Sequence, residues 1–191
     1  SEGNIVIQAG VNLGWTSGHT LTLLATNDIT SEGSIFTEGG NLFLTAGRNI
    51  NVQDIYTSYE GDSGDLSLTA LEGSITAGNL NTSSFGASSG DVILNAKGDI
   101  EVASIDTSSI DGQSGNVDVT TAGFFRVTGQ TSPSLGDLTP LSIDTRHLTF
   151  DFREGQEYFM NVVVAGDGGN IRIEHGGNGE TPFIVGDAAV N

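Results

Sequence analysis

The chain of 191 residues contains no cysteine, which excludes a disulfide framework, a thiolate zinc site and a cysteine nucleophile. It is also poor in positive charge: six Lys and Arg residues stand against 24 Asp and Glu residues, and the formal net charge is −18. Surfaces that follow phosphates or anionic lipids need clustered basic residues, so no nucleic-acid partner is expected. No apolar run reaches the about 18 residues of a membrane-spanning helix, so no membrane insertion is expected either.

The start of the chain has neither an initiator methionine nor the pattern of a signal peptide, which indicates a piece of a longer precursor. Apolar residues make up 36% of the sequence and alternate in short runs, a pattern that disordered chains lack. Glycine accounts for 28 of the 191 residues, which disfavours long helices. An all-β chain with many tight corners is therefore expected.

A short motif recurs along the chain: a glycine, a short polar residue, and two apolar residues separated by one position. Its copies begin at Gly3, Gly40, Gly64, Gly90, Gly115 and Gly169, with a looser copy at Gly18. From Gly40 to Gly64, Gly90 and Gly115 the intervals are 24, 26 and 25 residues. A polar corner with an isoleucine and a short segment ending in threonine follow most copies. Each repeat is thus expected to hold three short strands.

Three strands every 24 to 26 residues predict one triangular turn of a right-handed parallel β-helix, with residues 1–191 forming a single domain. Each strand would point one apolar set inward, and each coil would pair with its neighbours about 4.8 Å away. The seven copies predict seven coils. A β-propeller needs about 40 residues per blade, and a sandwich needs two-residue hairpin turns, so both are disfavoured.

The repeat is interrupted between Thr128 and Gly168. Residues 129–140 contain two prolines and no alternation, which predicts a loop excursion. Residues 146–165 contain two alternating segments around a polar turn, which predicts an inserted β-hairpin. Its aromatic residues need cover, so we expect the hairpin to lie against the flank of the rod.

The outward position of the third strand is the main candidate site. Along the repeats it reads Phe36, Tyr56, Asn81, Asp106 and Asp144. If the excursion loops out, Asp106 and Asp144 lie in adjacent coils about 5 Å apart. Carboxylates that close would raise one pKa or recruit a cation such as Ca²⁺, although a pair of solvated surface acids is the simpler interpretation. Phe36 beside Tyr56 would be a sugar-stacking platform or a plain packing contact.

No other motif predicts chemistry. Gly61-Asp62-Ser63-Gly64 matches the nucleophile motif of trypsin-like proteases, but Ser63 precedes a repeat glycine, as Ser89 and Ser114 also do. It is therefore a corner residue. The three histidines lack the spacing of metal ligands. Neither a catalytic residue nor a dedicated metal site is expected.

The coil motifs Gly-Asn/Asp-Φ-x-Φ, Ala-x-Gly-Asp-Ile and Ile-x-Thr resemble those of filamentous-haemagglutinin-like exoproteins of two-partner secretion. The segment from Asp167-Gly168-Gly169-Asn170-Ile171 to Asp187 is similar to one in large cyanobacterial exoproteins of this type, some joined to a CHAT (caspase-like) peptidase domain. The resemblance covers nearly the whole chain. It implies a secreted or cell-surface protein whose partner is an outer-membrane transporter. That transporter would be engaged outside this chain, because the NPNG- and NPNL-like motifs of the secretion domain are absent.

Together these observations predict a structural and adhesive rod segment without catalysis, whose partners would be surface glycans or cells. Two alternatives stay open. One is a β-helix polysaccharide lyase or glycosidase that uses Asp106 and Asp144, which a groove with several carboxylates and a basic residue would favour. The other is a recognition module attached to a CHAT peptidase domain.

Overall fold

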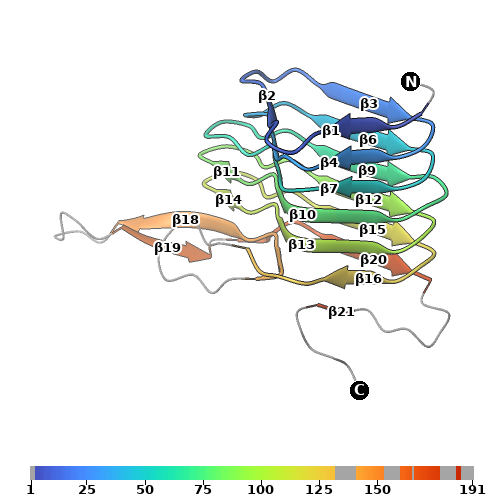
Figure 1. The fold of residues 1–191 in the computed structure, drawn as a ribbon. Helices are drawn as coiled ribbons and strands as arrows, with labels where there is room; N and C mark the ends of the chain where they lie inside the picture. Colours follow the sequence, from blue (N-terminus) through green and yellow to red (C-terminus); the bar gives the residue numbers. More distant parts are fainter. Residues whose placement is uncertain (1–2, 132–140, 153–159, 165, 177–183, 186–191) are drawn as a thin grey trace.

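In a computed structural model, residues 3–131, 141–152, 160–164, 166–176 and 184–185 are described, and every element among them is a β-strand. The strands stack in rungs around a common axis, so the chain is a parallel β-helix, or β-solenoid, as the repeat predicted (Figure 1). The described part of the chain contains no helix that could cross a membrane.

The first strand of each coil belongs to a six-stranded parallel sheet. Its strands, in spatial order, are β20 (Ile171–His175), β15 (Val117–Thr121), β12 (Val92–Ala96), β9 (Leu66–Ala70), β6 (Leu42–Ala46) and β3 (Leu21–Ala25). Val117 in β15 pairs with Ile171 in β20, although 54 residues separate them in the sequence. The interrupted region is therefore an insertion that leaves the register of the coils unchanged.

The second and third strands form a larger sheet. Its second-strand positions are β1 (Ile5–Ile7), β4 (Ile29–Ser31), β7 (Ile50–Val52), β10 (Ile75–Asn81), β13 (Ile100–Asp106), β16 (Phe125–Val127) and β21 (Ile184–Val185). Its third-strand positions are β2 (Leu13–Gly14), β5 (Ile35–Phe36), β8 (Ile55–Tyr56) and β17 (Ile143–Asp144). In β10 and β13 the second and third strands are continuous: β10 pairs with both β7 and β8, and β13 pairs with both β16 and β17.

The motif at Gly3 does not begin a coil, contrary to the prediction. Ile5 pairs with Ile29, so β1 is a second strand, and the first-strand sheet has six members instead of seven. The error has a simple cause: a polar corner followed by alternating apolar residues precedes both the first and the second strand of a coil. Only the distance along the chain from Ile5 to Ile29, which is a second-strand residue, shows that Ile5 begins a second strand and not a first strand.

The later coils have a fourth short side that the repeat did not predict. It is formed by β11 (Ser84–Phe85), β14 (Ser109–Ile110) and the beginning of β18 (His147–Phe152), in parallel register. Strand β18 continues into an antiparallel pair with β19 (Met160–Val164), as the hairpin prediction required. The pair projects away from the coils and does not lie along their flank (Figure 1), because β18 extends the fourth side in a straight line. Of the predicted excursion, residues 132–140 lie outside the described part of the chain.

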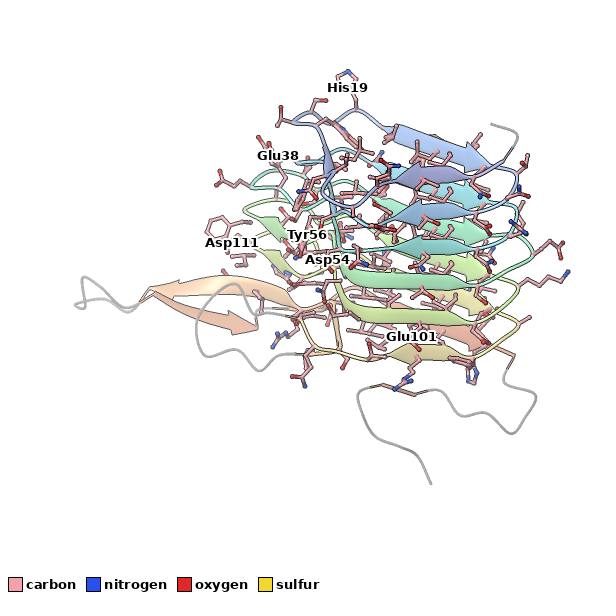
Figure 2. All side chains as sticks on the ribbon, viewed as in Figure 1. His19, Glu38, Asp54, Tyr56, Glu101 and Asp111 are labelled. Carbon is pink, nitrogen blue, oxygen red and sulfur yellow. The ribbon has the colours of Figure 1, made fainter. Side chains whose placement is uncertain are left out.

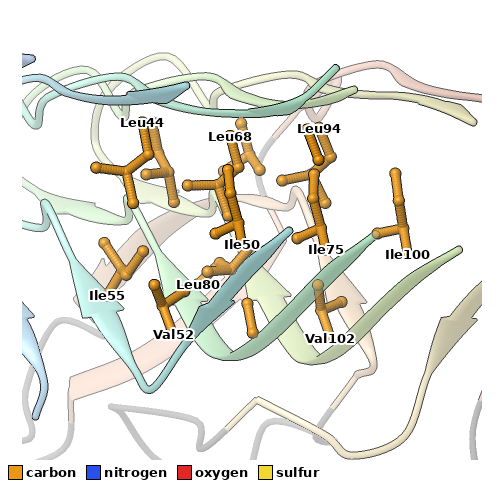
Figure 3. Close-up of a cluster of buried hydrophobic side chains, with 14 of the residues drawn as sticks. Leu44, Ile50, Val52, Ile55, Leu68, Ile75, Leu80, Leu94, Ile100 and Val102 are labelled. Carbon is orange, nitrogen blue, oxygen red and sulfur yellow. The ribbon is translucent and has the colours of Figure 1, made fainter. Parts of the chain in front are cut away.

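Aliphatic side chains from the sheets meet inside the coils. Leu44, Leu68 and Leu94 of the first strands lie opposite Ile50 and Ile75 of the second strands (Figure 3), and all are at most 1% exposed. A fully buried Leu or Ile contributes roughly 1.5–3 kcal/mol of hydrophobic stabilisation. Since one coil cannot enclose these side chains alone, each coil depends on its neighbours.

Polar corner residues also stack from coil to coil. Asn41 Oδ1 accepts a hydrogen bond from the N–H of Asp65 (2.8 Å), and Asp65 Oδ1 accepts one from the N–H of Asp91 (2.9 Å). In the same way, Asp91 Oδ1 accepts a hydrogen bond from the N–H of Asn116 (2.7 Å), and Asn116 Oδ1 accepts one from the N–H of Asn170 (2.9 Å). This ladder satisfies corner amides that would otherwise have no partner, and it explains the Asn or Asp that follows Gly40, Gly64, Gly90, Gly115 and Gly169.

Candidate functional site

A groove of about 630 Å³ follows the corner between the third and fourth sides of the rod. Residues from five consecutive coils line it, beginning with Glu38 and ending with Asp144, Arg146 and Leu148. Four coil spacings of about 4.8 Å make it roughly 19 Å long, with its long direction parallel to the rod axis. The groove is therefore shaped for an extended molecule.

The same local motif makes successive corners at the floor of the groove. Asn81 Oδ1 accepts hydrogen bonds from the backbone N–H of Ser83 (2.9 Å) and from its hydroxyl (2.7 Å). In the next coil Asp106 Oδ1 accepts the corresponding bonds from Ser108, at 3.0 and 2.7 Å. An Asx side chain that bonds the residue two positions on bends the chain, here from the third side to the fourth. The corner role explains why Asn or Asp occupies this position.

Asp144 forms the third corner and holds Arg146. It accepts hydrogen bonds from the backbone N–H of Arg146 at 3.0 Å and from Nε at 2.9 Å, both on Oδ1, and from Nη2 on Oδ2 at 2.5 Å. The Asp144 side chain is 5% exposed and that of Arg146 is 19% exposed. The hydrogen bonds that Arg146 donates to Asp144 raise the pKa of the guanidinium above its ordinary value. Both carboxyl oxygens of Asp144 are thus engaged within the protein.

Asp106 and Asp144 pair in adjacent strands β13 and β17, in the register expected from the repeat. They are not solvated surface acids, because only 8% and 4% of their respective surfaces are exposed. Burial is the main cause that raises the pKa of Asp106; the bonds from Ser108 oppose the rise, and the Asp144 carboxylate adds to it. Asp106 Oδ2 has no hydrogen-bond partner among the described residues. Within those residues no three acidic or histidine side chains converge on a point that could hold a metal ion.

Phe36 and Tyr56 are stacked, with ring centroids 5.1 Å apart and planes 5° from parallel. The Tyr56 hydroxyl donates to Asp54 Oδ2 (3.2 Å), and the two side chains lie together in Figure 2. Burial, with the Asp54 charge adding to it, raises the pKa of Tyr56. Neither ring lines the large groove. Tyr56 and Asp106 instead share a small cavity of about 80 Å³ on the third-strand face.

The aromatic residues that line the groove are Tyr59 and Phe85, which the sequence analysis did not single out. They are 49% and 46% exposed. Phe85 aligns with Ile110, and Ile110 aligns with Leu148, so an apolar column runs along one wall. For Phe85 a signal was present in the sequence, because an apolar residue follows Thr82, Thr107 and Thr145 at an offset of three residues; Tyr59 does not fit it, since it follows Thr57 by two.

No protein-family model matches this chain, and neither a curated protein nor a solved structure matches it. Hypotheses about function therefore depend on the stacked coils and on the groove.

Proposed function

We propose that the chain is a rigid rod segment of a large exported surface protein, and that it acts by holding binding surfaces at a distance. One observation carries the proposal: an unbroken column of buried residues, Leu42, Leu66, Val92 and Val117, passes through the coils in constant register. Every coil is stabilised by the next one, so bending the rod would separate paired strands and open the core. Stiffness is the property that such an architecture supplies.

Charge and folding order also support export. A net charge of −18 keeps neighbouring rods apart in solution. Coils that contact only their neighbours can fold one after another as the chain emerges outside the cell, without ATP. The resemblance of the coil motifs to filamentous-haemagglutinin-like exoproteins agrees with this. In this proposal the outer-membrane transporter engages a region outside this chain, and the rod is secreted or stays at the cell surface.

Export and rigidity can be tested together. The chain is placed behind the secretion domain of a two-partner exoprotein and expressed with the matching transporter. Protease-resistant chain should accumulate outside the cell, and small-angle scattering of the isolated chain should agree with the stacked coils. Retention in the periplasm, or a scattering profile of a flexible chain, would contradict the proposal.

A polysaccharide lyase or glycosidase is the second candidate, because the groove holds several carboxylates and one arginine. Asp106, with its raised pKa, has the character of a proton donor. Two features weigh against it: Asp106 and Asp144 are only 8% and 4% exposed, and Arg146 is held by Asp144. Incubation of polysaccharides with the wild-type protein and with Asp106→Asn tests this candidate. Cleavage that the substitution abolishes would replace the rod proposal.

A further inference from the structure

The groove has features that a purely mechanical rod does not need. Its lining contains four carboxylates, from Glu38, Glu60, Asp106 and Asp144, and one guanidinium, from Arg146. Arg146 pairs with Asp144 and its charge also acts on Asp106, so four carboxylates share one cation among the lining residues, and Glu38 and Glu60 form no ion pair with it. Uronates and other anionic polymers would be repelled here, and a ligand with positive charge would be attracted.

Asp106 offers a hydrogen-bond acceptor, its Oδ2 atom, to a ligand in the groove. Its residue surface is only 8% exposed, yet its Oδ2 atom has no hydrogen-bond partner among the described residues. That oxygen is not among the fully enclosed polar atoms that lack a partner, so solvent in the groove reaches it, and a ligand that brings an N–H or O–H group to Oδ2 can take the place of that solvent. An ammonium group supplies both the donor and the charge.

The walls suit sugar rings. The half-exposed rings of Tyr59 and Phe85 can cover the C–H faces of a saccharide, whereas Ile110 and Leu148 in the same wall are only 7% and 4% exposed. Ser108 also lines the groove, and its hydroxyl donates to Asp106 Oδ1. At roughly 19 Å, by the coil spacing, the groove has room for several consecutive rings.

A peptide strand fits the groove less well, because the backbone of the wall is already paired. The N–H of Phe85 donates to the carbonyl of Tyr59 (3.2 Å), and the N–H of Asp111 donates to that of Leu148 (2.8 Å). These bonds run along the axis from coil to coil. A peptide would find no free strand edge and would leave its own amides unpaired. A saccharide chain has no such requirement.

We propose that the groove binds an extended chain of amine-bearing sugars, with the chain parallel to the rod axis and an ammonium group at Asp106. The proposal rests on the proposed adhesive rod and names what the rod adheres to. The bound sugar would cover Tyr59 and Phe85, and the rim carboxylates Glu38 and Glu60 would add to the attraction.

The experiment uses two hexasaccharides that differ only in their nitrogen: hexameric glucosamine and its fully N-acetylated counterpart. Calorimetric titration at low salt should show at least about tenfold tighter binding of the glucosamine chain, and that advantage should shrink as salt rises. Asp106→Asn should weaken glucosamine binding about tenfold, and Phe85→Ala should weaken both hexasaccharides by a similar factor. Glu32→Gln removes one exposed charge outside the groove and should leave binding unchanged.

Asp106→Asn is a conservative test, because Asn81 makes the same corner one coil away. Circular dichroism and thermal unfolding verify that the variants are folded. The proposal is overturned if both hexasaccharides bind equally, if polygalacturonate or a lysine-rich peptide binds in preference, or if folded wild-type protein binds no hexasaccharide. It is overturned as well if Asp106→Asn changes nothing. Export and scattering do not involve the groove, so failure here and failure of the rod proposal are distinguishable.

Discussion

The hydroxyl of Thr107 donates a 2.7 Å hydrogen bond to the carbonyl oxygen of Gly115, which lies eight residues further along the chain. The N–H of Gly115 donates in return to the carbonyl of Thr107 (2.9 Å). The same reciprocal pair joins Thr82 and Gly90 one coil earlier. These threonines are fully buried, so the bonds close the fourth side from within and fix the wall that carries the groove.

Replacing Thr107 by valine keeps the shape of the side chain and removes this donor. The Gly115 carbonyl then loses its partner inside the coil, and the free energy of unfolding should fall by about 1–2 kcal/mol. Urea unfolding measures the change. Thr76→Val is the control, because Thr76 is an exposed residue of central strand β10. Equal effects of the two substitutions would show that the buried bond contributes nothing.

Leu94 and Ile93 are neighbours in β12 with opposite orientations. Leu94 is fully buried and Ile93 is 47% exposed. Leu94→Ala should lower the free energy of unfolding by about 2–5 kcal/mol, because it opens a cavity in the shared core. Ile93→Ala should cost less than about 1 kcal/mol. Denaturant titration of both variants tests the alternation on which the β-helix depends, and a reversed order would contradict it.

Gly90 lies directly beneath Gly64 in the stack of corners. A Cβ atom at Gly90 would approach the carbonyl oxygen of Gly64 to 2.1 Å. Because backbone atoms cannot yield as a flexible side chain does, Gly90→Ala should destabilise the protein by about 3 kcal/mol or more. At Gly18 a Cβ would meet nothing within 4 Å, so Gly18→Ala is the matched control. The midpoints of thermal unfolding compare the two, and tolerance of alanine at Gly90 would argue against this close stacking.

The sequence was sufficient to predict the coils and the register of the third strand. Constant spacing of Ile and Thr placed Asp106 beside Asp144 and Phe36 beside Tyr56, because a parallel stack aligns residues with equal offsets. The fourth side was not predicted, because a strand of two residues such as Ser84–Phe85 is too short to show an alternating pattern. The Asx-x-Ser spacing at Asn81 and Asp106 marks the bend, but the burial of Asp106 depends on the fourth side, which the repeat did not predict.

Asp106 should make stability depend on pH in the opposite sense to most aspartates. Its pKa lies above the ordinary value, mainly because burial disfavours the charged form. Below about pH 3.9 the carboxyl is protonated in the folded and unfolded chains, and it has no effect. As pH rises towards the raised folded pKa, only the unfolded chain ionises, so stability falls; above that pKa the loss is constant. Relative to the wild type, Asp106→Asn should therefore become more stable as pH increases from about 3 to 7.

Asp28 supplies a control with the opposite sign. A hydrogen bond from the backbone N–H of Asn49, aided by the charge of Arg48, lowers the pKa of Asp28. Its stabilisation is present above the pKa of the unfolded chain and is lost as pH falls through the lowered folded pKa. Asp28→Asn should accordingly become less stable than the wild type as pH rises. Urea unfolding at a series of pH values measures both differences, and two difference curves that run parallel would refute the assignment of opposite shifts.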